Sequence, residues 1–187
     1  MRTKIFTAAA ALVLLTMTMS ACAKKAEEPA KGSAAGGAIT WTGYTDGMKE
    51  SSETGKPVIV DFYTTWCKYC VKLDETTYKD PEVIRLMNEN FISIKVNAEG
   101  TAKVVHEGKT MTESELAAAY KVEGFPTIWF IDGKGVRIAP LPGYTAPEEF
   151  KPVLTYISGG AYARGIKYPD YVKSLGRPDD TGAKGAK

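Results

Sequence analysis

The sequence predicts an α/β fold, in which a central mixed β-sheet is flanked by helices and one helix is added at the C-terminal end. Three observations lead to this prediction. Residues 58–63 form an unbroken run of β-branched and aromatic side chains around one aspartate, which is typical of a strand covered on both faces. Further strand-like runs alternate with segments of helical periodicity. The turn sequence Asp-Gly-Lys-Gly at 132–135 separates two such runs and predicts an antiparallel pair.

The first predicted elements surround the strand at 58–63. The polar segment 41–53 is expected to contain a short helix, which Gly55 and Pro57 bring to an end. After the strand, a turn leads into a helix from about Lys68 to Thr77. Strand, turn and helix therefore follow one another without a long loop.

The middle of the chain carries two helix starts and a second strand. Asp-Pro-Glu at 80–82 supplies an N-cap, a proline at the first helical position and an acidic first turn. Residues 91–96 have the composition of a strand. A helix is predicted at 112–120, because Thr112 and Glu115 have the spacing of a capping box.

The last elements are a strand pair and two helices. Residues 127–131 and 136–139 are predicted to be the strands on either side of the turn. A helix is expected at 147–157, which begins with Pro-Glu-Glu. The stretch 162–175 is too apolar for a free tail and is expected to pack as an added helix around Pro169, although its aromatic residues could instead face a partner.

Composition divides the 187 residues into five predicted parts. These are a lipoprotein-type signal peptide at 1–21, a flexible linker at 22–38, one folded domain at 39–160, a helical extension at 161–175 and a disordered tail at 176–187. The domain is long enough for one core and shows no internal repeat. The net charge of +2 is small, so nucleic acid is not an expected partner.

The N-terminus has the pattern of a bacterial export signal. Arg2 and Lys4 precede an apolar run at 5–19, which is shorter than the roughly 18 residues that favour a transmembrane helix. Met-Ser-Ala-Cys at 19–22 resembles the lipobox of bacterial lipoproteins, in which the cysteine is acylated after cleavage. We therefore expect Cys22 to anchor the protein to a membrane on the extracytoplasmic side. The alternative is an ordinary secreted protein that is cut near residue 21 or 23.

A Cys-X-X-Cys motif lies where the strand at 58–63 gives way to a helix. Cys67 is expected at the helix N-terminus, where unpaired backbone N–H groups and the helix dipole stabilise a thiolate. Lys68 adds positive charge beside it. Cys70 is one helical turn further on and can attack a mixed disulfide on Cys67. The motif therefore predicts thiol:disulfide exchange through a Cys67–Cys70 disulfide, with no cofactor.

Three other uses of the two cysteines are weaker. A structural zinc site needs about four ligands, but beyond Cys22 the chain offers two cysteines and His106. A c-type haem motif requires histidine where the chain has Val71. A purely structural disulfide across so short a loop would constrain little of the unfolded chain. We therefore expect no metal at this motif.

The stretch 60–70, Val-Asp-Phe-Tyr-Thr-Thr-Trp-Cys-Lys-Tyr-Cys, resembles the active site of thioredoxins, and Gly-Phe-Pro-Thr at 124–127 resembles their cis-proline loop. The resemblance covers about residues 41–158 and implies the thioredoxin fold. Gly-Lys-Pro at 55–57, Leu-Asp-Glu at 73–75 and Asp-Pro-Glu-Val at 80–83 are more similar to the C-terminal domain of DsbD reductant transporters. Two later stretches, 141–144 and 147–150, also resemble periplasmic thioredoxins of the SoxW kind.

The resemblance implies roles for further residues. Asp61 matches the buried carboxylate that moves a proton to or from the resolving cysteine, and burial without a partner raises the pKa of such a group. Lys95 matches the lysine that pairs with this carboxylate, and a solvated charge at the strand end is the alternative. Trp66 is expected to shape the docking surface. A cis peptide between Phe125 and Pro126 would place the Phe125 backbone beside the sulfurs, where an extended substrate can pair with it.

The chain also departs from common thioredoxins. Lys-Tyr at 68–69 replaces their Gly-Pro, so the direction of electron flow does not follow from the resemblance. The segment 98–111 is longer than the thioredoxin fold needs and contains His106, the only histidine of the chain. A histidine in such a loop is usually solvated, and a place near the site is the alternative.

The leading functional hypothesis is an extracytoplasmic enzyme that reduces or isomerises disulfides in exported proteins. Its partners would be exported protein thiols and disulfides, together with a membrane electron donor of the DsbD type. One alternative is a copper-binding chaperone that uses Cys67, Cys70 and His106, since a cysteine pair suits Cu(I). A disulfide-forming oxidant is another, and it would have an unusually stabilised thiolate.

Overall fold

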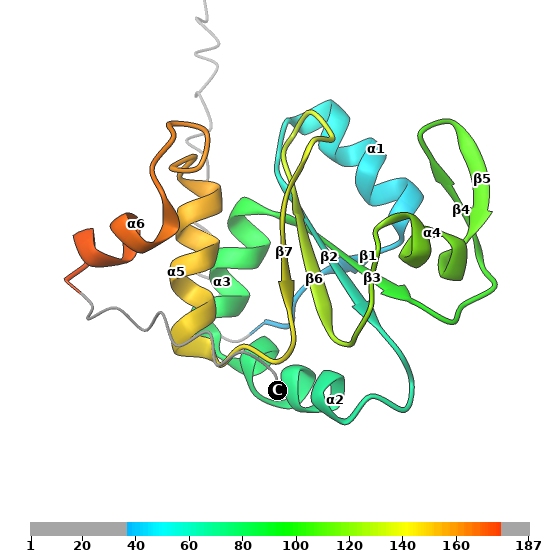
Figure 1. Ribbon diagram of the computed structural model, residues 1–187, viewed down its shortest axis with the longest axis horizontal. Coiled ribbons are helices and arrows are strands. Elements are labelled where there is room, and N and C mark those ends of the chain that lie inside the picture. The colour runs from blue at the N-terminus through cyan, green and yellow to red at the C-terminus, as the bar shows by residue number, and fades with distance from the viewer. Residues whose placement is uncertain (1–36, 177–187) are drawn as a thin grey trace, which may run out of the picture. The chain divides into compact units, whose positions relative to one another are not determined.

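The structure is a computed structural model that describes residues 37–176. Among these residues, five strands form one sheet in the order β1-β3-β2-β6-β7, and β4 and β5 form a separate hairpin (Figure 1). The strands are β1 (Trp41–Thr42), β2 (Val58–Tyr63), β3 (Ile92–Asn97), β4 (Lys103–His106), β5 (Lys109–Thr112), β6 (Thr127–Ile131) and β7 (Arg137–Pro142).

The sheet is mixed, as predicted. β1 and β2 both run parallel to β3, whereas β6 is antiparallel to β2 and β7 is antiparallel to β6. The turn between β6 and β7 is closed by the Asp132 amide, which donates to the Val136 carbonyl at 2.9 Å. The parallel register places Asp61 of β2 directly opposite Lys95 of β3. Two residues of the candidate site are therefore brought together by strand pairing alone.

Six α-helices and one short 3₁₀ turn, η1 (Thr77–Lys79), complete the described part of the chain. The helices are α1 (Tyr44–Thr54), α2 (Lys68–Glu75), α3 (Pro81–Asn90), α4 (Glu113–Ala119), α5 (Pro147–Ser158) and α6 (Tyr168–Ser174). Helix α1 ends at Gly55, whose positive φ of 73° suits glycine. The predicted capping box of α4 is confirmed, with Thr112 and Glu115 each accepting from the other's backbone N–H.

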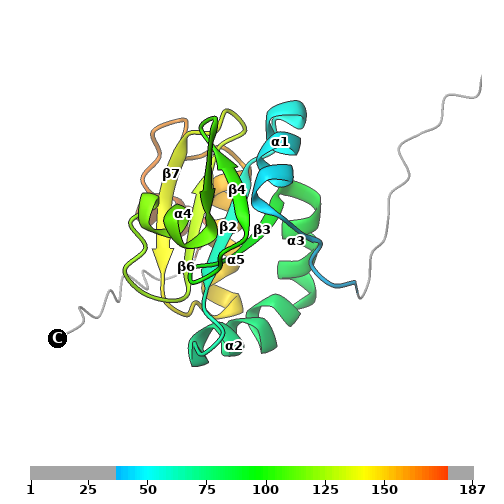
Figure 2. The same ribbon diagram turned by 90° about the vertical axis from the view of Figure 1, so that its right-hand side faces the viewer.

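Two apolar cores lie on the two faces of the sheet, because side chains alternate along each strand. Ile59 packs with residues of α2, α3 and α5, whereas its neighbours Val58 and Val60 pack with residues of α1 and α4. Figure 2 shows α4 on one side of the sheet and α5 on the other. Asp61 has the same parity as Ile59, so its carboxylate lies on the α2 side. Leu73 of α2 is fully buried in that core and fixes the helix that carries the cysteines.

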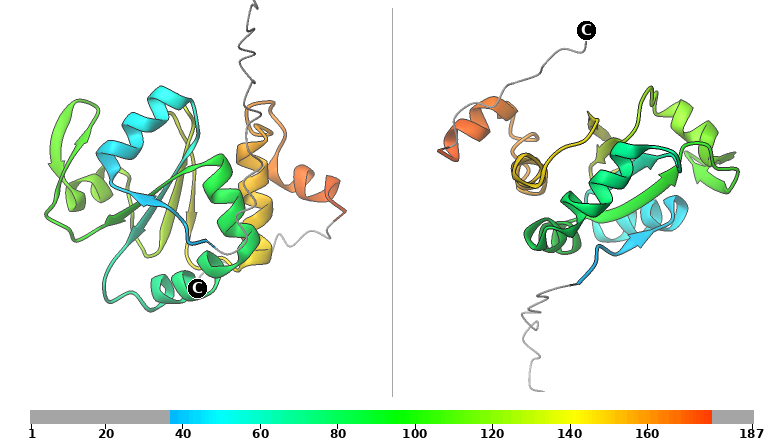
Figure 3. Two further views of the ribbon diagram at one scale, coloured as in Figure 1. Left: turned by 180° about the vertical axis from the view of Figure 1, so that it is seen from behind. Right: turned by 90° about the horizontal axis from the view of Figure 1, so that it is seen from below.

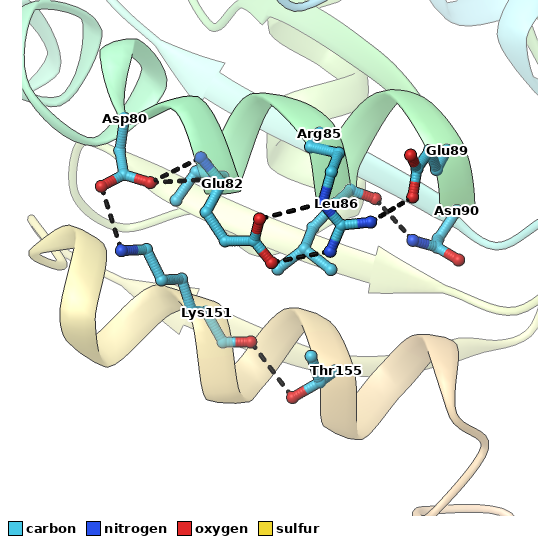
Figure 4. A network of polar contacts seen from close by, with 9 residues as sticks. Asp80, Glu82, Arg85, Leu86, Glu89, Asn90, Lys151 and Thr155 are labelled. Atoms are coloured by element: carbon cyan, nitrogen blue, oxygen red, sulfur yellow. Dashed lines mark hydrogen bonds and ion pairs between the residues drawn. The ribbon is translucent and has the colours of Figure 1, made fainter. Parts of the chain in front are cut away.

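Helices α3 and α5 pack side by side, and polar contacts link them at the start of α3. The Asp80 carboxylate caps α3 by accepting from the amides of Glu82 and Val83 at 2.9 and 3.0 Å. Lys151 of α5 reaches the same carboxylate at 3.0 Å (Figure 4). Such partly exposed ion pairs contribute little to stability. We therefore attribute the helix pairing mainly to the apolar core between them.

The structure differs from the sequence prediction in several places. The segment 41–53, predicted to contain a short helix, also contains the edge strand β1 at residues 41–42, before α1 begins at Tyr44. The predicted helix from 68 to 77 ends at Glu75 and continues as the turn η1. The segment 98–111, for which no regular structure was predicted, contains the hairpin β4–β5, which packs against α1 and α4.

The predicted C-terminal helix is confirmed as α6, which packs beside α5 at the edge of the domain remote from the hairpin (Figure 3). Aromatic rings make this contact: Tyr156 of α5 lies 5.3 Å from both Tyr168 and Tyr171, centroid to centroid. The Tyr156 hydroxyl also donates to the Ile166 carbonyl at 2.7 Å. The aromatic residues of the extension therefore serve packing within the chain.

The predicted signal peptide, Cys22, the linker as far as residue 36 and the tail from residue 177 lie outside the described residues. Across residues 37–176, no helix has both the length and the apolar composition needed to cross a membrane.

Candidate active site

The two cysteines lie at the start of α2 and form a disulfide, with their Cα atoms 5.3 Å apart. Cys67 is the N-cap residue, and its backbone is extended, with φ −75° and ψ 105°. The amide of Cys70 donates to the Cys67 sulfur at 3.1 Å. The first sulfur is therefore at the positive end of the helix and accepts from the Cys70 N–H, which also donates to the Cys67 carbonyl, and the same donor would stabilise its thiolate.

The disulfide is enclosed, while its surroundings are exposed and aromatic. Cys67 and Cys70 are each 5% exposed, whereas Trp66 and Tyr69 are 64% and 61% exposed. A reactive disulfide beside exposed rings suits attack by a group that docks on the surface around it.

Asp61 lies in β2 on the α2 side of the sheet and is almost completely buried. Burial raises the pKa of Asp61 to about 7, although the nearby Lys95 acts in the opposite direction. Its Oδ1 atom and the hydroxyl of buried Tyr78 both lack a hydrogen-bond partner of good geometry among the described residues. Because no donor satisfies the charged form fully, the carboxyl can hold a proton near neutral pH.

Lys95 lies between two carboxylates. Its Nζ is 2.5 Å from Asp74 Oδ1 but 4.0 Å from Asp61 Oδ2, so the stronger ion pair is with Asp74. The rings of Trp41 and Tyr63 each have their centroid 5.2 Å from Nζ. The sequence suggested either an ion pair with Asp61 or a solvated charge at the strand end. In the structure Lys95 is paired, but mainly with Asp74.

Asp74 was not identified from the sequence. It lies on α2 one turn after Cys70, where helical spacing places both residues on the same face. By attracting Lys95, it leaves Asp61 less well compensated, and its own charge also raises the pKa of Asp61. The position of Asp74 one turn beyond the second cysteine is the signal that could have suggested a role.

Trp66 connects two loops at the edge of the site. Its indole ring lies edge-on to Phe125, with centroids 5.9 Å apart, and its Nε1 donates to Glu99 Oε2 at 2.9 Å. The Phe125–Pro126 peptide is cis. Because Thr127 pairs with Phe62 in the sheet, the loop before β6 lies beside the end of β2 that leads to the cysteines. Glu99 is the second residue that the sequence analysis missed.

His106 does not belong to this group. Its Nδ1 is 2.7 Å from the Tyr44 hydroxyl, which is in turn 2.8 Å from the Tyr120 hydroxyl. These contacts join the β4–β5 hairpin to α1 and to the end of α4. Burial lowers the pKa of His106, Glu107 opposes this effect, and Arg137 adds to it. His106 therefore holds the β4–β5 hairpin against α1 and α4, and it is not part of the disulfide site.

We expect acid to weaken this contact. Since the pKa of His106 is lowered from 6.5 in the folded state, the unfolded chain binds more protons as the pH falls through 6.5, and stability is lost. As the pH falls from 7.5 to 5.5, the free energy of unfolding of the wild type should therefore decrease more than that of His106→Gln. Asp61 titrates in the same range, but its contribution cancels in this difference. A difference that is independent of pH would contradict the assignment.

Across residues 37–176, no group of three or more histidine, cysteine or acidic side chains is arranged to hold a metal ion. His106, the third ligand of the copper alternative, contacts Tyr44 and Tyr120 instead of the cysteines.

Comparisons with known proteins agree with the fold and the motif. The profile of the thioredoxin-like domain matches residues 44–158. The chain is 26% identical over 102 residues to the disulfide bond reductase DsbH of Chlamydia pneumoniae, which covers 54% of this chain and 61% of that protein. It is 32% identical over 98 residues to the thiol:disulfide interchange protein DsbD of Escherichia coli K12, which covers 51% of this chain and 16% of DsbD. The matched region thus spans less than two thirds of either relative.

A solved thioredoxin-fold protein from Helicobacter pylori is 28% identical and superposes with a TM-score of 0.56, over 65% of this chain and 81% of its own. The mixed sheet with helices on both faces is therefore a fold that the chain shares with this solved protein. Because the family profile spans more than half of its length, this chain belongs to the thioredoxin-like domain family.

Proposed function

We propose that the protein is a thiol:disulfide oxidoreductase that reduces or isomerises disulfides in exported proteins through Cys67 and Cys70. The observation that carries this proposal is the Cys67–Cys70 disulfide at the N-terminus of α2, with the Cys67 sulfur accepting from the Cys70 amide and Asp61 buried on the same side of the sheet. The family membership supports it, as do the names of the two relatives, a disulfide bond reductase and a thiol:disulfide interchange protein.

The reaction begins with the dithiol form of the protein. The Cys67 thiolate attacks one sulfur of a substrate disulfide, forms a mixed disulfide and releases the other substrate sulfur as a thiolate. Cys70, once deprotonated, attacks the Cys67 sulfur of the mixed disulfide and releases the second substrate sulfur. Two electrons have then passed to the substrate, which is reduced to a dithiol, and the protein holds the Cys67–Cys70 disulfide. In isomerisation, a substrate thiol resolves the mixed disulfide instead, and the protein returns to the dithiol.

Asp61 is the proposed proton acceptor for Cys70. Its pKa of about 7 suits a group that takes a proton in one step and returns it in another near neutral pH. Lys95 limits how far burial raises that pKa, and Asp74 limits the effect of Lys95 by pairing with it. The charge state of Asp61 thus depends first on its burial and then on Lys95 and Asp74, which β3 and α2 bring beside it.

Substrate docking is proposed to use the exposed aromatic surface beside the cysteines. Trp66 and Phe125 provide the rings, and Pro126 fixes the loop that carries Phe125. The Pro126 carbonyl itself accepts from the Gly143 amide at 2.8 Å, which ties this loop to the end of β7. An extended substrate segment would lie along this loop and present its disulfide to Cys67.

The export signal pattern supports a location outside the cytoplasm, with the domain tethered to a membrane by acylated Cys22 and the linker. The electron donor that fits this location is a membrane reductant of the DsbD type. A thiol pair on that donor would reduce the Cys67–Cys70 disulfide by the same exchange in reverse.

The proposal predicts catalysed reduction of a protein disulfide. In the presence of dithiothreitol, the wild type should accelerate the reduction of insulin, followed as precipitation of its free B chain, because Cys67 offers a better placed nucleophile than dithiothreitol. Cys67→Ser should be inactive, and Tyr69→Phe is the matched control, since it alters the motif without touching sulfur. Equal rates for the wild type and Cys67→Ser would refute the proposed activity.

A further inference from the structure

Glu99 makes a contact with Trp66 that neither the motif nor the family membership assigns. Trp66 is 64% exposed, yet its indole is held from two sides, by Glu99 Oε2 at 2.9 Å and by the edge-on ring of Phe125 at 5.9 Å. An exposed tryptophan without these contacts would sample several rotamers. Here the ring bridges the loop after β3 and the loop before β6, directly next to Cys67.

The backbone of Glu99 is itself held in a folded turn. The Glu99 amide donates to Asn97 Oδ1 at 3.1 Å, and the Gly100 amide donates to the Asn97 carbonyl at 2.7 Å. The residue between, Ala98, donates its amide to the Tyr63 carbonyl at 2.8 Å and so ties the turn to the end of β2. The backbone that carries the Glu99 side chain is therefore fixed by the sheet before any substrate arrives.

We propose that Glu99 is a positioning residue, which holds Trp66 against Phe125 so that the two rings present one preformed docking surface to protein substrates. This inference rests on the proposed function and adds to it. Ordering an exposed side chain during docking costs conformational entropy, and a side chain ordered beforehand avoids that cost. The contact should therefore act on binding of substrates large enough to touch Trp66, and much less on exchange with a small disulfide that touches only sulfur.

The test compares two substrates in single turnovers of the reduced protein, with the remaining thiols alkylated after an acid quench. Glu99→Ala is expected to raise the half-saturating concentration of insulin about three- to tenfold, the size expected for one exposed hydrogen bond to a charged group. Its maximal rate with insulin should change far less, and so should its rate with hydroxyethyl disulfide. Glu99→Gln keeps a carbonyl oxygen that can accept from the indole, so it should restore most of the affinity.

Glu123→Ala is the control for charge. Glu123 is exposed and lies two residues before Phe125, so its loss removes the same charge close to the same loop. If Glu123→Ala weakens insulin binding as much as Glu99→Ala, or if Glu99→Gln is as impaired as Glu99→Ala, charge rather than the hydrogen bond is responsible and the proposal is overturned. An unchanged half-saturating concentration in Glu99→Ala overturns it as well.

The same experiment separates this proposal from the function on which it rests. A wild type that reduces neither insulin nor hydroxyethyl disulfide removes the proposed function and the role of Glu99 with it. A wild type that reduces both, with no selective defect in Glu99→Ala, removes the role of Glu99 alone. A further readout is independent of activity: the indole N–H resonance of Trp66, assigned with Trp66→Phe, should move upfield in Glu99→Ala and remain close to its place in Glu99→Gln.

Discussion

Replacing Cys70 with serine is expected to abolish turnover while preserving the first half of the reaction. Cys67 keeps its place at the start of α2, so its thiolate still attacks a substrate disulfide. Serine cannot resolve the mixed disulfide that results, because its oxygen is a poor nucleophile towards sulfur at neutral pH. The Cys70→Ser variant should therefore accumulate a covalent adduct with insulin, visible as a mass increase of one insulin molecule that dithiothreitol removes.

The matched control is Cys67→Ser, which retains the second cysteine and lacks the first. Cys70 is 5% exposed and lies inside α2, whereas Cys67 is the N-cap residue, whose sulfur accepts from a backbone amide of the first helical turn. We therefore expect no adduct with this variant. If both single variants form adducts at equal rates, Cys67 is not the preferred nucleophile, and the assignment of the two roles is wrong. With exported proteins as substrates, the adducts formed by Cys70→Ser would identify the natural partners.

The second large effect is expected for Asp61→Asn, on stability and on its dependence on pH. In the folded protein burial raises the pKa of Asp61 from 3.8 to about 7, so between these values the folded state binds more protons than the unfolded state. Stability is therefore lost as the pH rises through this range, by up to about 4 kcal/mol above pH 7. Asparagine stays neutral at every pH. The variant should be more stable than the wild type at pH 8 by an amount of this order and similar to it near pH 3.5.

Urea unfolding of the oxidised protein measures this effect without interference, because the disulfide-bonded cysteines do not titrate. Asp46→Asn is the matched control: Asp46 is exposed in the first turn of α1 and has no part in the site, so the same chemical change should alter stability much less. In the reduced protein, Asp61→Asn should slow the closure of the Cys67–Cys70 disulfide at neutral pH about tenfold to a hundredfold, since the proton acceptor for Cys70 is lost. A stability difference that does not change between pH 3.5 and pH 8 would contradict the raised pKa.

The parts of the fold that were predictable are those in which local composition and tertiary packing agree. β2 is apolar except for Asp61 and packs on both faces, and α3 and α4 carry capping residues that mark their first turns. The resemblance to thioredoxins and to DsbD is confirmed by the family profile and by the similarity to DsbD of Escherichia coli. The resemblance to SoxW-type proteins, the lipid anchor and the five-part division of the chain stay predictions.

The elements that were missed are held mainly by their neighbours. β1 contains two residues, too few for any periodic pattern, and exists because β3 offers it an edge. In the hairpin, Val104 alone is buried along β4, and the turn uses Glu107 at φ 49° in place of the usual asparagine before Gly108. β7 extends further than predicted, through Pro140 and Pro142, which an edge strand tolerates.

The site residues likewise divide into those that the local sequence identifies and those that only the folded structure reveals. The cysteines and Asp61 could be identified because their positions in a strand-turn-helix motif have a chemical meaning. Asp74 and Glu99 could not, since a partly exposed carboxylate on a helix or in a turn usually indicates only a solvated surface. Their importance comes from Lys95 and Trp66, which meet them only in the folded structure.

The central claim is that Cys67 and Cys70 form a reversible redox pair, and equilibration with glutathione tests it most directly. The purified protein is incubated with mixtures of reduced and oxidised glutathione, then alkylated and weighed by mass spectrometry. We expect one two-electron transition, in which both cysteines pass together from alkylated to protected as the proportion of oxidised glutathione rises. The midpoint would give the reduction potential and so the direction of electron flow. Two cysteines that remain alkylated in every mixture, or that only form adducts with glutathione, would contradict the claim.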